Sequence, residues 1–69
     1  MNLNHKNLLI TGGTGSLGKK LTKRLLLNWP HINRLVIFSR DEQKQFVMAQ
    51  EFSNDEYPCM RYFLGDVRD

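Results

Sequence analysis

Features that stabilise or localise many small proteins are scarce in this sequence of 69 residues. The single cysteine, Cys59, cannot form an internal disulfide, and a chain without disulfides fits a reducing compartment. The two histidines, His5 and His31, lie far apart and lack the spacing of metal ligands. The longest apolar run near the amino terminus, residues 8–10, is too short for a signal-peptide core or a membrane span. We therefore expect a cytoplasmic protein that does not bind membranes.

Acidic residues are absent from residues 1–40, which contain seven lysines and arginines. Residues 41–69 contain seven acidic and three basic residues, so the net charge of +3 is the sum of +7 and −4. The amino-terminal part therefore favours an anionic ligand, either nucleic acid or a nucleotide cofactor. Because no aromatic residues are interleaved with the basic ones, a solvated helix surface is a better interpretation than a nucleic-acid site for Lys19, Lys20, Lys23 and Arg24.

The hydrophobic pattern predicts two strand–helix units followed by a third strand. Apolar runs that do not alternate with polar residues, at 7–11 and 35–38, are typical of strands buried on both faces, and residues 60–64 fit a third strand. Leu17, Leu21 and Leu25 recur every four residues and predict the buried face of a helix that ends near Asn28. Strands separated by helices predict an α/β fold with a parallel sheet and right-handed crossovers.

A second helix is predicted after the second strand. Ser39-Arg40-Asp41-Glu42 matches the capping box S-x-x-E, in which the serine side chain caps the helix. The buried face of this helix is expected to consist of Gln45, Met48, Ala49 and Phe52.

Three glycines at regular spacing, Gly12, Gly15 and Gly18, follow the first predicted strand. In dinucleotide-binding folds the first such glycine allows a sharp turn, the second lets a pyrophosphate approach the backbone, and the third lets helix and strand pack closely. Amides at the start of the helix then bind the anion with the help of the helix dipole. The alternative, a turn shaped by packing alone, would need only one of these glycines. The predicted phosphate-binding turn consists of Gly12, Gly13, Thr14, Gly15, Ser16, Leu17 and Gly18.

The residues after the second strand favour NADP over NAD. Ser39 leaves space for a 2′-phosphate, and Arg40 supplies a planar, permanently charged fork for it. Lys44 adds a second positive charge one helical turn later. Asp41 is the counter-evidence, because an acidic residue in this region often holds the free 2′-hydroxyl of NAD. Its alternative role is to place a negative charge at the start of a helix.

The residues after the third predicted strand indicate the start of a further strand–helix unit. Asp66 and Val67 follow the third strand, where this fold places adenine, although Asp66 could equally cap a following helix. In the expected strand order 3-2-1 the first strand lies at the edge of the sheet, yet residues 7–11 contain no charge or proline that would protect an edge. We therefore expect residues 1–69 to be the amino-terminal segment of a truncated Rossmann domain.

Three blocks of sequence also resemble a known family. The block 11–18, Thr-Gly-Gly-Thr-Gly-Ser-Leu-Gly, is similar to the fingerprint of the extended short-chain dehydrogenases/reductases, and Leu17 stands where that family often has an aromatic residue. The block 39–42 together with Lys44, Gln45, Met48 and Phe52, and the block 60–69, are more specific. Together they resemble the amino terminus of the bacterial UDP-N-acetylglucosamine 4,6-dehydratases (inverting) of pseudaminic acid and surface-polysaccharide biosynthesis.

The resemblance implies an NADP-dependent lyase without net redox change, homo-oligomeric at full length. A hydride would leave C4 of a UDP-sugar, water would be lost across C5 and C6, and the hydride would return to C6. The Tyr-x-x-x-Lys pair of the family does not occur here, since Tyr57 is followed four residues later by Arg61, and Tyr62 by Asp66. We therefore expect these residues to bind the cofactor and to be catalytically inactive alone. The alternatives are a sugar-nucleotide epimerase or reductase, a nucleotide-binding remnant without catalysis, and a small basic nucleic-acid binder.

Overall fold

The computed structural model describes residues 2–12 and 14–65. It contains the five elements that the hydrophobic pattern predicts, in the predicted order. They are β1 (Asn7–Thr11), α1 (Ser16–Asn28), β2 (Arg34–Ser39), α2 (Glu42–Glu51) and β3 (Met60–Leu64).

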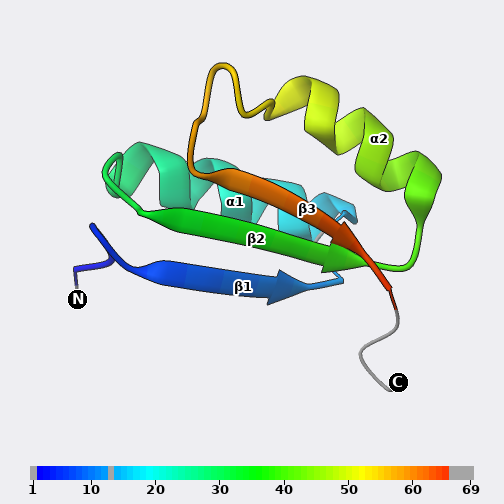
Figure 1. The fold of residues 1–69 in the computed structure, drawn as a ribbon, viewed down its shortest axis with the longest axis horizontal. Helices are drawn as coiled ribbons and strands as arrows, with labels where there is room; N and C mark the ends of the chain where they lie inside the picture. Colours follow the sequence, from blue (N-terminus) through cyan, green and yellow to red (C-terminus); the bar gives the residue numbers. More distant parts are fainter. Residues whose placement is uncertain (1, 13, 66–69) are drawn as a thin grey trace.

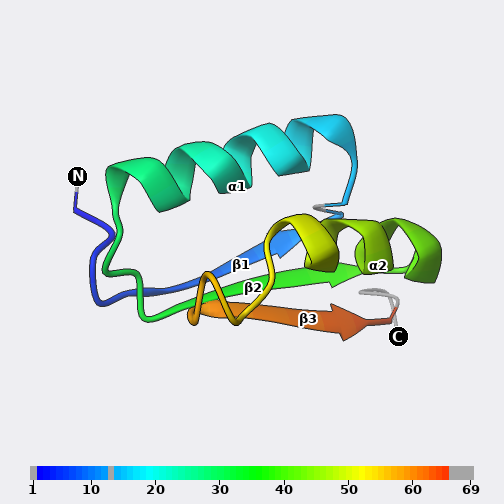
Figure 2. The ribbon, with the colours of Figure 1, turned by 90° about the horizontal axis from the view of Figure 1, so that it is seen from above.

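The three strands form one parallel sheet in the order β1-β2-β3, which is the expected order 3-2-1. Two hydrogen bonds extend the pairing by one residue at the carboxyl ends of the strands: the Gly12 amide donates to the Phe38 carbonyl (2.8 Å), and the Gly65 amide donates to the Ser39 carbonyl (3.0 Å). Both helices lie on the same side of the sheet (Figures 1 and 2). This follows from two right-handed crossovers that proceed in one direction across the sheet.

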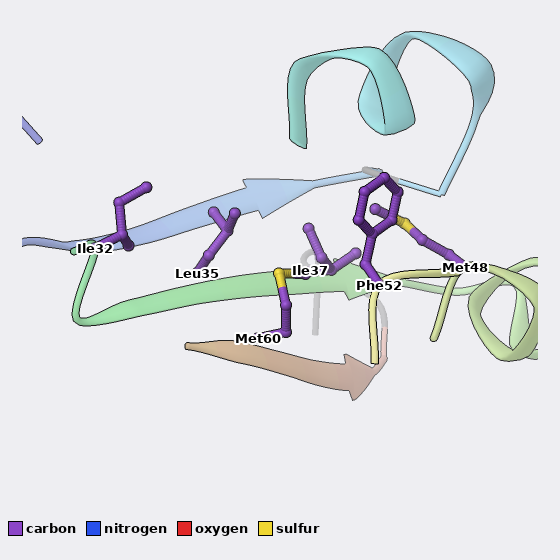
Figure 3. Packing of buried hydrophobic residues seen from close by; sticks show 6 residues of the cluster. All are labelled: Ile32, Leu35, Ile37, Met48, Phe52 and Met60. Atoms are coloured by element: carbon purple, nitrogen blue, oxygen red, sulfur yellow. The ribbon is translucent and has the colours of Figure 1, made fainter. Parts of the chain in front are cut away.

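The hydrophobic core lies between the sheet and the helices. Side chains from β2, α2 and β3 meet there, and Leu35, Ile37 and Met48 are completely buried (Figure 3). Tyr62 reaches from β3 towards α2, and its hydroxyl donates to the Phe52 carbonyl (2.6 Å). The buried cluster consists of Ile32, Leu35, Ile37, Met48, Phe52 and Met60.

Helix α2 begins later than the capping box predicts. Its N-cap is Asp41, whose carboxylate accepts a hydrogen bond from the Lys44 amide (3.0 Å), and Ser39 is the last residue of β2. Both Ser39 and Asp41 have the short polar side chain preferred at an N-cap. Because the strand pairing extends through Ser39, the cap is formed by Asp41. The predicted inner face is confirmed for Gln45, which also donates to the Phe63 carbonyl (2.9 Å), and for Met48.

Helix α1 presents the face predicted by the leucine spacing only in part. Leu17 is 80% exposed and Leu21 is 43% exposed, whereas Gly18 and Thr22 are buried. In the first turns the inner face is therefore displaced by one residue, about 100° around the helix, whereas Leu25 and Leu26 further along pack against the core. The two residues buried in these turns, Gly18 and Thr22, are small, whereas the exposed ones are leucines.

Strand β1 is covered on one face, which corrects the expectation of burial on both. Leu8 and Ile10 pack against the core from the helix side, whereas Leu9 points the other way and is 63% exposed. Phe63 on β3 is also exposed. Among residues 2–12 and 14–65 no helix covers this second face, because both helices lie on the first (Figure 2).

Candidate nucleotide-binding site

The glycine turn leaves β1 at the carboxyl edge of the sheet. Gly12 has φ +65°, a left-handed conformation that costs other residues about 1–2 kcal/mol. Because the Gly12 amide donates to the Phe38 carbonyl, the turn is fixed directly beside the end of β2. The prediction of a sharp turn at this glycine is confirmed.

Gly15 is the N-cap of α1 and has an extended backbone, with φ −75° and ψ 176°. A side chain is compatible with these angles, and a Cβ atom built at Gly15 would meet nothing within 4 Å. Neither backbone conformation nor packing against the protein therefore requires glycine here. The packing alternative for the turn thus leaves Gly15 unexplained, whereas a ligand that approaches the backbone explains it.

The remaining predicted residues of the turn differ in exposure. Thr14 is buried, Ser16 and Leu17 are exposed, and Gly18 is a buried residue of α1. Helix α1 begins at Ser16, and the first amides of a helix have no partner within it. They form an electropositive group at the carboxyl edge of the sheet.

The segment after β2 lies on the opposite side of this site. Ser39 is buried, and its hydroxyl donates to the Asp41 carbonyl (3.4 Å), so this side chain shapes the turn between β2 and α2. Arg40 is exposed. The carboxylate of Asp41 is directed to the start of α2, where it accepts from the Lys44 amide. The interpretation of Asp41 as a charge at a helix N-terminus is therefore confirmed by its geometry.

A cavity of about 490 Å³ joins the two segments. Among the predicted site residues its lining includes Asp41 and Lys44, together with three residues of the glycine turn. Lys19, Gln43 and Val47 also line it and were not predicted. The leucine spacing placed Lys19 on the solvated side of α1, and the rotation of that helix accounts for the difference. Thr14, Gly15 and Ser16 are the turn residues in the lining.

Three predicted site residues, Gly13, Asp66 and Val67, lie outside the described residues. The cofactor positions assigned to them stay predictions.

The perturbed titratable groups lie outside the lining of this cavity. Burial raises the pKa of the Cys59 thiol, which makes it a poor nucleophile at neutral pH. Burial also raises the pKa of Tyr62 to about 12. The described residues contain no cluster of three or more side chains that could bind a metal ion. The cavity itself offers a ligand two lysines, a carboxylate and the first residues of α1.

Neither of the two described helices is long and apolar enough to cross a lipid bilayer.

The parallel sheet, the two helices on one side and the glycine turn at the carboxyl edge define a Rossmann-like α/β unit. The family model described as "Polysaccharide biosynthesis protein" matches residues 8–69. The chain therefore belongs to this family, in agreement with the resemblance of its sequence blocks.

Two curated relatives have different activities in their names. The chain is 62% identical over 66 residues to a UDP-N-acetylglucosamine 4,6-dehydratase (inverting) of Campylobacter jejuni, a match that covers 96% of this chain and 19% of the relative. It is 46% identical to a UDP-glucose 4-epimerase of Rickettsia bellii, with 93% of this chain and 18% of the relative covered. The chain thus spans about one fifth of the length of these relatives.

A solved structure has the same fold. The X-ray structure of Pen from Bacillus thuringiensis superposes on the whole of this chain with a TM-score of 0.85 and 38% sequence identity, and the matched part is 21% of that protein. The predicted partial Rossmann fold is confirmed.

Proposed function

We propose that this chain binds NADP at the carboxyl edge of its sheet, as the cofactor-binding segment of a sugar-nucleotide 4,6-dehydratase. The observation that carries the proposal is the space beside Gly15: a residue that the protein itself does not require to be glycine opens onto a cavity at the start of α1. A pyrophosphate that approaches the backbone needs this combination of missing Cβ and exposed amides.

The residues beyond β2 support NADP rather than NAD. Asp41 caps α2 through its carboxylate, which opposes the alternative that it holds a free ribose 2′-hydroxyl. Lys44 lines the cavity, and Arg40, which is exposed and precedes the N-cap of α2, would supply a planar, permanently charged fork for a 2′-phosphate. When bound, the nicotinamide would supply reversible hydride transfer, while this segment would hold the phosphates and the adenosine.

The substrate would be a UDP-sugar, because the curated relatives that match this chain are named for reactions of UDP-sugars. The greater identity to the dehydratase favours dehydration over the alternative, a sugar-nucleotide epimerase. The chain lacks a Tyr-x-x-x-Lys pair, so these residues alone would be catalytically inactive. The nucleotide ligands and the single cysteine both fit the cytoplasm.

Cofactor binding is tested by isothermal titration calorimetry of the chain with NADP and with NAD. We expect NADP to bind at least about tenfold more tightly, a difference of about 1.4 kcal/mol. A folded chain, as judged by circular dichroism, that binds neither dinucleotide would overturn the proposal.

The reaction is tested by exchange of segments. Residues 1–69 would replace the matching segment of the Campylobacter dehydratase in one chimera and that of the Rickettsia epimerase in another. We expect the first chimera to dehydrate UDP-N-acetylglucosamine with NADP. Activity of the second chimera alone would favour the epimerase.

A further inference from the structure

Lys19 differs from its basic neighbours on α1. It is half-buried, whereas Lys20, Lys23 and Arg24 are exposed. It also lines the cavity between the glycine turn and the start of α2, and the other three do not. The basic face of α1 therefore has two parts: an exposed part, and one lysine that lies beside the candidate nucleotide site.

Lys19 and Lys44 line this cavity from different helices. Lys19 belongs to the first turns of α1, where its amide donates to the Gly15 carbonyl (3.0 Å). Lys44 belongs to the first turn of α2. Both helices also begin at this cavity, so the positive ends of two helix dipoles add to the two ammonium groups. An anion between the helices would face positive charge on both sides.

The carboxylate of Asp41 is the acidic group in the lining. One of its oxygens is engaged by the Lys44 amide at the helix cap. The lining therefore combines two lysine side chains with a single carboxylate, so it offers more positive than negative charge to a ligand.

We propose that Lys19 and Lys44 together clamp the 2′-phosphate of NADP, which makes Lys19 a specificity-determining residue for NADP over NAD. The inference rests on the proposed function, since it assumes that the dinucleotide lies along this cavity. A phosphomonoester has the charge for such a site, because a dianion can bind two ammonium groups at once, whereas the 2′-hydroxyl of NAD carries no charge. Arg40 would then approach the same phosphate from the exposed side.

The test is the affinity of Lys19→Gln for NADP, NAD and 2′-AMP, measured by calorimetry at 0.15 M salt. We expect NADP and 2′-AMP to bind at least about tenfold more weakly than to the wild type, while the affinity for NAD changes by less than about twofold. Lys20→Gln is the matched control, because it removes the same charge one residue along the helix at an exposed position outside the cavity. At this ionic strength, charges beyond about 8 Å are largely screened, so the control should bind all three ligands normally.

The outcomes separate this inference from the proposed function. If the wild type binds no dinucleotide, the proposed function fails. If the wild type binds NADP and Lys19→Gln weakens NADP and NAD equally, Lys19 contacts the pyrophosphate and the specificity role is wrong. If Lys19→Gln leaves NADP binding unchanged, or if Lys20→Gln has the same effect, the clamp is also refuted.

Discussion

Replacement of Gly15 by alanine separates a ligand-binding glycine from a structural one. The backbone of Gly15 is extended, and a Cβ there would meet no protein atom within 4 Å, so the folded state accepts the methyl group without a clash. Alanine is a poorer N-cap than glycine by roughly 0.5–1 kcal/mol. It also restricts the unfolded chain, which stabilises the fold by about 0.4–1 kcal/mol. We therefore expect the free energy of unfolding to change by less than about 1 kcal/mol.

Binding should respond very differently. The added methyl group would occupy the space in which a pyrophosphate approaches the first amides of α1. We expect Gly15→Ala to bind NADP at least about tenfold more weakly, a loss of about 1.4 kcal/mol or more. Unfolding in urea and calorimetric titration of the same preparation measure the two quantities together.

Gly12→Ala provides the comparison, because its φ of +65° makes the substitution costly for the fold itself. A loss of about 1–2 kcal/mol in stability is expected for this variant. The reasoning is refuted if Gly15→Ala binds NADP as tightly as the wild type. It is also refuted if Gly15→Ala loses more than about 2 kcal/mol of stability, since the glycine would then be structural.

Substitutions at three further positions test the fold. Asp41→Ala should lower the free energy of unfolding, measured in urea, by about 1 kcal/mol, because it removes the cap on the Lys44 amide. Asp41→Asn should keep the cap, so equal losses in the two variants would contradict this role. Thr22→Val should stabilise the chain by about 1 kcal/mol, because the Thr22 hydroxyl is buried without a partner among the described residues; destabilisation in urea would contradict it. Burial raises the pKa of Tyr62 in the folded chain to about 12, from an ordinary value of 10.0. The contribution of the neutral phenol to the free energy of unfolding is therefore complete below pH 10 and is lost as the pH rises towards 12. The stability advantage of the wild type over Tyr62→Phe should therefore be about 1 kcal/mol at pH 7 and shrink by pH 11; a gap that widens would refute the raised pKa.

The order of elements was predictable because each strand is an apolar run bounded by polar or glycine-containing segments. The parallel sheet followed from the alternation of strands and helices, and its order is the one expected of a dinucleotide-binding fold. The inner face of α1 was only partly predictable from hydrophobicity. Leu25 packs against the core as the leucine spacing predicts, but in the first turns the buried residues are Gly18 and Thr22, which are small and not strongly hydrophobic.

The glycine turn could be assigned to the carboxyl edge from its position after a strand, and Gly12 has the conformation that the turn requires. The place of Lys19 in the cavity lining was missed for the same reason as the inner face of the first turns of α1, since both depend on the orientation of that helix. The cap of α2 was displaced from Ser39 to Asp41 because both residues are good caps and the extent of strand pairing decides between them.

The central claim is that amides at the start of α1 bind the phosphates of a dinucleotide, and a ¹H–¹⁵N NMR titration of the chain with NADP tests it most directly. The account predicts that the largest and saturable shifts occur at the amides of Gly15 and Ser16, with a second group at Lys44. Saturable shifts that spare these amides and centre on the amino ends of the strands, or on the exposed face around Leu9, would contradict it.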